Sequence, residues 1–360
     1  MAGVDYGARS TWAGLSETAL TTEWEAFVAH GPLKTACPKV GVDFFYYPNL
    51  RRKIRGAKAL HDIAAGETLC KVPIQALLSV YALRNSSFSP IANHFLKGDP
   101  EGVQARARVL RLRQRGGVDH RALLALFAIR ESARVSSPYM PYMQMLNTHD
   151  TGGIPMLWET NSSRWAGLSK GLAAMAHRSR MQAHSAFAQV VPVAIADFAR
   201  ELSDGLPCAS ASIIRGGKVC SPEALREVYT KAEYLRLYAI ISARDWVLPV
   251  YGRQMQFCAP IMDMFNFGQV GIRANFEDTQ HAFVAKATQK IAKGTELLFY
   301  YGSFCADQWR NMYGFVPANV RSCGERAASA GVRTREAPAR ALRAPPPARS
   351  HRSPPIGSGR

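Results

Sequence analysis

Short strand-like segments flank a long helical block in this chain. Between residues 42 and 80, the segment IRGAKALHDI leads through an Ala65-Gly66 turn into the alternating segment TLCKVP, which Pro73 ends. After Trp246 the strand pattern returns, with AFVAKAT and ELLFYY joined by the KIAKGTE turn. We expect these two β-units of modest size to complete one another in space. The order favours an α+β fold with a helical outgrowth over an alternating doubly wound fold.

Apolar residues at helical spacing fill the block from Tyr81 to about Arg244. Within it, SSPYMPYMQML is expected to be a proline-broken aromatic segment. The Ser221-Pro222-Glu223 run has the form of a helix start, with a serine cap and then a proline and an acid in the first turn. We therefore predict helices over residues 22–31, about 120–134, about 169–200, and from 221 through TKAEYLRLYAIISARDW.

The composition is that of a globular protein, with 47% hydrophobic and 20% charged residues among 360. The sequence has no run of 18 apolar residues, and its first twenty residues lack the apolar centre of a secretion signal. We therefore expect no membrane segment. The expected location is intracellular, in the cytoplasm or the nucleus, with the chloroplast as an alternative.

The last forty residues carry much of the net charge of +18. Residues 321–360 hold nine arginines against Glu325 and Glu336, a local charge of +7 that leaves +11 for the rest. This segment has almost no large apolar side chains, so burial cannot offset its ordering entropy, and we expect disorder. Such a tail could bind nucleic acid or an acidic partner, although a solvated basic end is the simpler explanation.

Seven cysteines are scattered along the chain, and none of them forms a CxxC pair. Because the count is also odd, we expect neither a zinc or other metal site nor a disulfide framework. Reduced thiols fit an intracellular compartment. The cysteines are Cys37, Cys70, Cys208, Cys220, Cys258, Cys305 and Cys323.

Several common enzyme motifs are absent from the sequence. There is no P-loop and no HExxH, and the only Gly-x-Gly lies at residues 357–359, so no dinucleotide-binding turn follows a strand. One GxSxG occurs at residues 167–171, but the polar TNSSRWA before it is not the core strand that a nucleophile elbow requires. Ser169 is better explained as a helix N-cap than as the nucleophile of a hydrolase.

Polar residues in the apolar segment CAPIMDMFNF are candidate ligand contacts. Asp263 and Asn266 lie there, and they either cap the local backbone or bind something. Tyr300-Tyr301-Gly302 ends an apolar strand and has an ordinary alternative, a core aromatic pair with a turn glycine.

Two further candidate site positions also have an ordinary structural explanation. Arg244 follows an apolar helical face and stands next to Asp245, as a surface ion pair would. Gly56 stands in a basic turn with Lys53, Arg55 and Lys58 around it.

Together these segments resemble the SET-domain protein methyltransferases, most closely the plant-type group typified by Rubisco large-subunit methyltransferase. The resemblance covers roughly residues 22–319. It is strongest at PIMDMFNF, KGTELLFYYG and YGFV, and extends to RGAKALHDIAAGETLCKVP, RALLALFAIRES, SSPYMPYMQML and ISARDW. In that family a helical insertion splits the SET β-fold. The resemblance thus implies SET parts at 22–80 and 236–320, an insertion at 81–235 and a disordered tail at 321–360.

The resemblance implies S-adenosylmethionine (S-adenosyl-L-methionine) as methyl donor and a protein lysine, or in one branch a histidine, as acceptor. Carried over by position, Gly56 and the backbone around Arg55 line the cofactor, and Arg244 pairs with its carboxylate. Tyr301 falls on the catalytic tyrosine, with Tyr300 and Tyr251 as candidate walls of the acceptor channel.

The C-terminal motif supplies the other implied contacts. Asp263, Asn266 and the backbone of Phe267 would hold the amino-acid part and the adenine of the cofactor. Phe315 would pack against the adenine side.

The chain departs from the family pattern at four places. Phe267 stands where a histidine is usual, and Lys53, Ile54 and Arg55 precede the single Gly56 where an acid and two glycines are usual. Ala306 replaces a frequent asparagine, and no helical substrate-binding domain follows residue 319. These departures keep open a catalytically degenerate SET-fold protein that binds a partner. A basic nucleic-acid-binding protein is a third alternative, which rests mainly on the tail and the charge.

Overall fold

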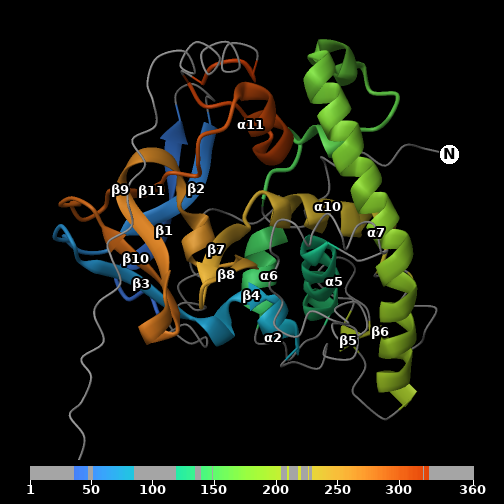
Figure 1. Ribbon diagram of the computed structural model, residues 1–360, viewed down its shortest axis with the longest axis horizontal. Coiled ribbons are helices and arrows are strands. Elements are labelled where there is room, and N and C mark those ends of the chain that lie inside the picture. The colour runs from blue at the N-terminus through green and yellow to red at the C-terminus, as the bar shows by residue number, and fades with distance from the viewer. Residues whose placement is uncertain are drawn as a thin grey trace, which may run out of the picture.

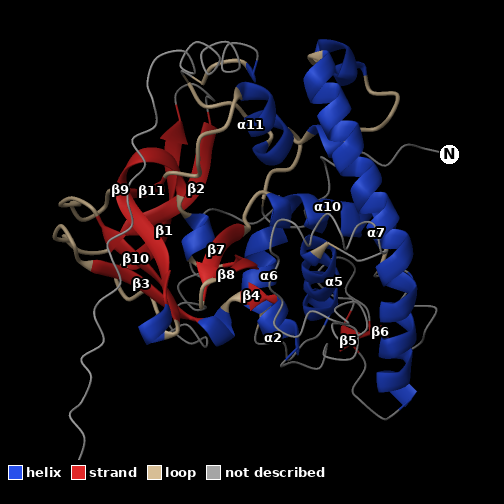
Figure 2. Ribbon diagram, viewed as in Figure 1, coloured by secondary structure: helices blue, strands red, loops and turns tan. Residues whose placement is uncertain are grey.

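The computed structural model describes residues 36–47, 52–84, 119–133, 139–147, 149–203, 209–210, 218–219, 226, 229–318 and 320–323. Most strands lie on one side of the described part and most helices on the other (Figure 1), and Figure 2 shows the same arrangement by colour. This arrangement confirms the predicted α+β class. Several predicted features lie outside the described residues: the helix at 22–31, the helix start at 221, Cys208, Cys220 and the basic tail beyond residue 323.

A six-stranded sheet interleaves strands from the two β-units of the chain. Its order is β1-β2-β11-β9-β10-β3, in which β11 pairs antiparallel with β2 and parallel with β9. The two β-units therefore complete one another within one sheet. The strands are β1 (Val40–Tyr47), β2 (Arg52–Ala59), β3 (Thr68–Pro73), β9 (Asn266–Glu277), β10 (Ala282–Ala287) and β11 (Glu296–Phe299).

Two smaller sheets accompany it. The first has the order β4-β8-β7, and its β7–β8 hairpin turns through Tyr251 and Gly252, both with positive φ. The second pairs β5 with β6. The strands are β4 (Leu78–Ser79), β5 (Ala209–Ser210), β6 (Lys218–Val219), β7 (Trp246–Val250) and β8 (Arg253–Cys258).

The helical side is centred on α5, which is buried on every side between residues 122 and 129. A helix that is apolar all round belongs to a core. Four helices pack directly against α5, namely α2, α6, α7 and α10. No helix in the described ranges is long and apolar enough to cross a bilayer. The helices are α2 (Val80–Arg84), α5 (His120–Ala133), α6 (Met140–Asn147), α7 (Lys170–Ser203), α10 (Lys231–Ser242) and α11 (Ala306–Tyr313).

Helix α7 confirms the predicted long helix and its cap. The Oγ of Ser169 accepts a hydrogen bond from the backbone N–H of Leu172 at 3.0 Å and donates to Asp307 at 2.9 Å. A 3₁₀ helix at residues Ser163–Gly167, not a strand, precedes it. The GxSxG segment is therefore a helix start and not a nucleophile elbow.

Two helix predictions need correction. Helix α10 begins after Thr230, whose Oγ1 accepts from the N–H of Glu233 at 3.2 Å, so no helix runs unbroken from 221. The segment expected to be broken by proline contains α6 instead. Pro141 is the second residue of α6, a position where its missing N–H removes no helical hydrogen bond.

The structure also corrects the expectation of reduced cysteines. Cys37 is bonded to Cys70 and Cys305 to Cys323, while Cys258 is a buried free thiol. The partners stand 33 and 18 positions apart, so the fold brings them together and no local spacing motif reveals them. The thiol-based argument for an intracellular compartment therefore fails, and the location stays a prediction from the other features.

Candidate active site

Arg244 lies at the corner between α10 and β7 and faces the segment that carries Asp263. Its Nη1 donates to the carbonyl oxygen of Asp263 at 2.6 Å, and its Nη2 lies 3.0 Å from Nδ1 of His149. Its Nε is buried and has no hydrogen-bond partner in the part of the chain that the structure describes. Since buried polar groups are normally paired, this N–H is available to an anionic group that enters the site.

Asp263 sits in a short 3₁₀ turn (Met262–Met264) that follows the left-handed backbone of Ile261, with φ at 75°. A β-branched residue rarely adopts this conformation, and such strain concentrates at functional sites. Tyr142 of α6 donates its hydroxyl proton to Oδ2 of Asp263, whereas Oδ1 is buried with no partner among the described residues. Burial raises the pKa of Asp263 to about 6, although Arg244 and Tyr142 act in the opposite direction.

Gly56 of β2 lies against the side chains of Asn266 and Glu296. A Cβ at this position would stand 2.5 Å from Oε1 of Glu296 and 2.7 Å from Nδ2 of Asn266. That Nδ2 donates to Oε1 of Glu296 at 2.7 Å and to the carbonyl of Arg55 at 3.0 Å. Tyr47 donates to the same Oε1 at 2.8 Å. The absent side chain at Gly56 thus leaves room for a hydrogen-bonded cluster that ties the start of β9 to β1, β2 and β11.

The side chain of Arg55 reaches from β2 toward α6 and the Asp263 turn. Its Nη2 donates to the carbonyl oxygen of Met145 at 3.3 Å and lies 3.4 Å from the sulfur of Met264. Desolvation and the nearby Arg244 lower the pKa of Arg55 to about 9, while Asp263 raises it. Two guanidinium groups therefore act on the Asp263 carboxylate.

Tyr301 follows β11, and its hydroxyl donates to the carbonyl oxygen of Phe265 at 2.6 Å. Its ring stacks on Trp309 and lies 5.2 Å from the ring of Tyr313, both from α11. Burial raises the pKa of the Tyr301 hydroxyl despite the opposing effect of Arg244. The group is therefore a neutral hydroxyl at physiological pH, fixed by a backbone carbonyl and by ring packing.

Phe267 and Phe315 belong to the same aromatic cluster around α11. The ring of Phe267 lies 4.5 Å from Trp309 and 5.8 Å from Tyr301. Phe315 lies 5.7 Å from Trp309 and is 36% exposed. At the position where the resemblance leads one to expect histidine, Phe267 thus contributes ring packing against Trp309.

A pocket of about 60 Å³ brings three of the predicted site residues together: Arg244, Asp263 and Tyr301. Gly56 and Asn266 meet in the separate hydrogen-bonded cluster on β2, and Arg55, Phe267 and Phe315 also lie outside the pocket lining. The residues that line it are Ala243, Arg244, Asp245, Trp246, Met262, Asp263, Phe265, Phe299, Tyr301 and Tyr313.

The two tyrosines expected to wall an acceptor channel do not line this pocket. Tyr300 is 47% exposed, and Tyr251, equally exposed, packs in the β7–β8 turn against Phe276 and His281. The aromatic walls are Trp246, Phe265, Phe299 and Tyr313 together with Tyr301.

The sequence reasoning missed other residues that shape the site. Tyr142 and Glu296 bind Asp263 and Asn266 from 121 and 30 positions away. Both lie in segments that carry the resemblance, but no pattern there assigned them a contact. For Asp245, the ordinary alternative was a surface ion pair with Arg244. Its side chain is instead 4% exposed and pairs with Arg121 of α5 at 3.0 Å.

Comparison with known proteins finds no sequence relative but a clear likeness in structure. No protein-family model matches the chain, and no curated protein sequence matches it. The solved SET domain of LSMT bound to lysine and AdoHcy matches with a TM-score of 0.52 at 12% identity, over 85% of this chain and 59% of that one. Rubisco LSMT bound to sinefungin and monomethyllysine matches with a TM-score of 0.51 at 13% identity, over 85% and 57%.

A third structure, the SET domain of LSMT bound to MeLysine and AdoHcy, gives a TM-score of 0.52 at 14% identity, over 84% and 57% of the two chains. The chain thus spans less than three fifths of the length of the structures that it matches. Identity this low speaks for the fold alone. On this likeness, the chain has the fold of the SET domain of Rubisco LSMT.

Proposed function

We propose that this protein is a methyltransferase that uses S-adenosylmethionine and modifies a lysine side chain of another protein, with histidine as an alternative acceptor. The observation that carries the proposal is that Arg244, Asp263 and Tyr301 line one pocket. Arg244 and Asp263 each have a buried polar atom with no partner among the described residues, and their charges match the carboxylate and ammonium of an amino-acid group. Solved structures of the same fold hold AdoHcy and lysine.

The polar groups fit the amino-acid end of the donor, whereas the pocket is smaller than the whole donor. Ligands of that size occupy pockets of about 300 Å³ or more, against about 60 Å³ here. The nucleoside therefore requires the pocket to open. We propose that the opened space is lined by Gly56, the backbone around Arg55, Asn266, the backbone of Phe267, and Phe315.

When bound, S-adenosylmethionine would supply a methyl group on a positively charged sulfur. The role of the protein is to align donor and acceptor, because an in-line transfer gains most from fixed geometry and from polar groups near the methyl. Tyr301, held by the carbonyl of Phe265, is the group proposed to orient the acceptor amine. The aromatic walls disfavour an ammonium ion by desolvation, so the acceptor enters as a neutral amine and needs no dedicated base.

A second candidate is a SET-fold protein that binds a partner without methylating it. The pocket volume favours this alternative, and so does the use of Nδ2 of Asn266 in two internal hydrogen bonds. Cofactor binding is required of the first candidate alone, and where binding occurs, methyl transfer decides between the two.

We further propose that residues 22–80 and 236–320 form the two parts of a SET domain around a helical insertion at 81–235. Helix α10 runs across the boundary at 235, so the insertion and the second SET part would join through a continuous helix. The basic tail at 321–360 is proposed as the contact for any acidic or nucleic-acid partner, because its local charge is +7.

S-adenosylmethionine is expected to raise the Tm of the protein. A ligand at 100 times its Kd that binds only the folded state adds about 2.7 kcal/mol of stability, or roughly 5–10 °C for a cooperatively folding part of about 150–250 residues. Thermal scans over a concentration series measure the shift, and Arg244→Gln serves as the control that should lose most of it. The absence of a shift at millimolar ligand would exclude the enzyme and favour the partner-binding candidate.

Cofactor affinity is expected to fall as the pH drops through 6. The pKa of Asp263 is about 6, so below that value the carboxyl is increasingly protonated and loses its attraction for the donor ammonium. The limiting slope is about tenfold in Kd per pH unit. Calorimetry from about pH 5 to about pH 8 measures it. Asp263→Asn should bind more weakly at neutral pH and show a flat profile, and an unchanged slope in that variant would assign the titration to another group.

A further inference from the structure

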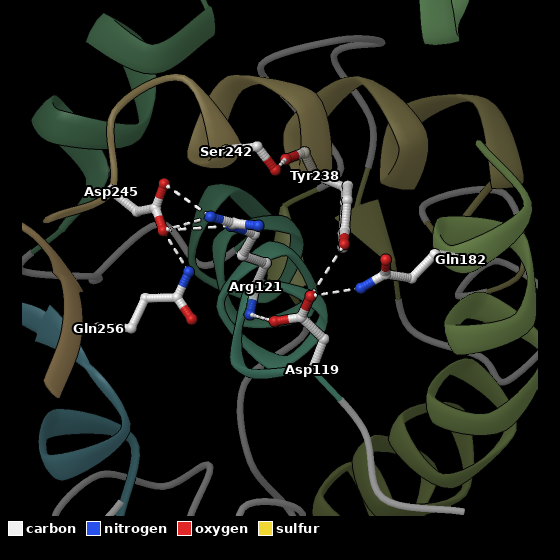
Figure 3. Close-up of polar contacts among 7 residues, drawn as sticks. All are labelled: Asp119, Arg121, Gln182, Tyr238, Ser242, Asp245 and Gln256. Atoms are coloured by element: carbon white, nitrogen blue, oxygen red, sulfur yellow. Dashed lines mark hydrogen bonds and ion pairs between the residues drawn. The ribbon is translucent and has the colours of Figure 1, made fainter. Parts of the chain in front are cut away.

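A polar network ties the corner that carries Arg244 to the helical side of the molecule (Figure 3). Oδ2 of Asp245 accepts hydrogen bonds from Nε and Nη2 of Arg121 at 3.1 and 3.0 Å and from the side-chain amide of Gln256, and its Oδ1 accepts from the same Nη2 at 3.4 Å. The side chain of Asp245 is 4% exposed and that of Arg121 is 32% exposed. Arg121 comes from α5 and Gln256 from β8, so Asp245 joins both elements to the corner.

Asp119 is the second centre of this network. Its Oδ1 caps α5 by accepting from the backbone N–H of Arg121 at 3.0 Å. Its Oδ2 accepts from Gln182 of α7 at 2.8 Å and from the hydroxyl of Tyr238 of α10 at 3.0 Å. Asp119 therefore joins three helices to one another, whereas Asp245 holds the corner where α10 ends.

The backbone N–H groups of the corner bond back to the last turns of α10. The N–H groups of Arg244 and Asp245 both donate to the carbonyl oxygen of Ile241, at 3.0 and 2.8 Å, before β7 begins. The two side chains then bind different partners, Arg244 the Asp263 carbonyl and Asp245 the Arg121 guanidinium. Arg244 and Asp245 are adjacent in the chain and line the same pocket. The bonds that hold the side chain of Asp245 therefore also fix the position of Arg244.

We infer that Arg121 and Asp245 are positioning residues, whose ion pair fixes the α10–β7 corner so that Arg244 faces the pocket beside Asp263. The inference rests on the proposed function, since it names what holds the residue that would take the donor carboxylate. A guanidinium that bonds both oxygens of a carboxylate fixes orientation as well as distance. Leaving a buried carboxylate without its cation is strongly unfavourable. The two side chains of the pair therefore stay together, and together they hold the corner in place.

The alternative is that the pair only adds to overall stability, and Asp119→Asn provides the matched comparison. Both Asp245→Asn and Asp119→Asn remove one carboxylate charge from the same network, but only the first touches the corner. We expect Asp245→Asn to speed amide hydrogen exchange at residues 243–246 of the ligand-free protein at least about tenfold. It should also raise the Kd for S-adenosylmethionine by about ten- to a hundredfold, because misplaced binding groups lose this much. Asp119→Asn should lower the Tm while both corner exchange and Kd stay within about twofold.

Arg121 provides an independent series in case Asp245→Asn fails to fold. Arg121→Lys retains the charge without the bidentate geometry and should give intermediate corner exchange, whereas Arg121→Gln should match Asp245→Asn. Equal corner exchange in wild type and Arg121→Gln would overturn the inference, as would equal effects of Asp119→Asn and Asp245→Asn on exchange and Kd. If the proposed function itself is wrong, the wild-type protein will not bind S-adenosylmethionine, which is a different result from either of these. The exchange rates still decide in that case whether the pair holds the corner.

Discussion

The Tyr301→Phe variant is expected to lose methyl-transfer activity by about 10²- to 10³-fold, the usual effect of removing one preorganised polar contact at a reacting centre. The hydroxyl is held by the Phe265 carbonyl at 2.6 Å, while the ring packs against Trp309 and Tyr313. Phenylalanine retains that packing, so the fold and the cofactor affinity should stay close to wild type.

Radiolabelled methyl transfer to proteins of a cell lysate measures the loss, and calorimetry measures the affinity. Tyr300→Phe is the matched control, because it removes a hydroxyl from the neighbouring tyrosine, which is 47% exposed and outside the pocket. It should retain full activity. Equal labelling by Tyr301→Phe and wild type would remove Tyr301 from its proposed role.

Gly56→Ala is expected to destabilise the protein by about 1–3 kcal/mol, the usual cost of an added group in a packed site. The new methyl would stand 2.5 Å from Oε1 of Glu296 and 2.7 Å from Nδ2 of Asn266, so their hydrogen bond must lengthen or break. The same displacement disturbs the bond from Tyr47 to Glu296. The Tm should fall by roughly 2–12 °C.

Gly167→Ala is the control for the glycine substitution. A Cβ at Gly167 meets nothing within 4 Å, so this variant should keep the wild-type Tm to within about a degree. Thermal scans of both variants make the comparison. If Gly56→Ala and Gly167→Ala melt together, the cluster around Gly56 is looser than its distances indicate, and its proposed place beside the cofactor loses its support.

Local patterns predicted much of this fold. The strand patterns of TLCKVP and AFVAKAT indicate β3 and β10, and Ser169 before a long apolar stripe indicates the start of α7. These features depend on a few neighbouring residues, which is why sequence spacing reveals them. Proline misled the prediction at α6, because a proline in the first turn of a helix and a proline that breaks one differ only in position.

The site was only partly predictable, because it depends on contacts between residues that are far apart in the chain. Motif resemblance singled out Arg244, Asp263 and Tyr301, which do meet at one pocket. The partners that hold them lie in segments that also carry the resemblance, but no pattern there assigned them these contacts. Tyr142 and Arg121 bind Asp263 and Asp245 from 121 and 124 positions away, so their roles follow from how helices pack against the corner. The disulfide between Cys37 and Cys70 was missed in the same way.

The pairing of β2 with β11 bears on how the protein is made. Lys58 faces Glu296 across these strands, so β2 gains that neighbour only after more than 230 further residues have been synthesised. Contacts of such separation are slow to form. Until β11 has left the ribosome, one side of β2 is an open strand edge, which invites pairing with other chains. The cluster around Gly56 is therefore completed late in biosynthesis, once β11 has been made.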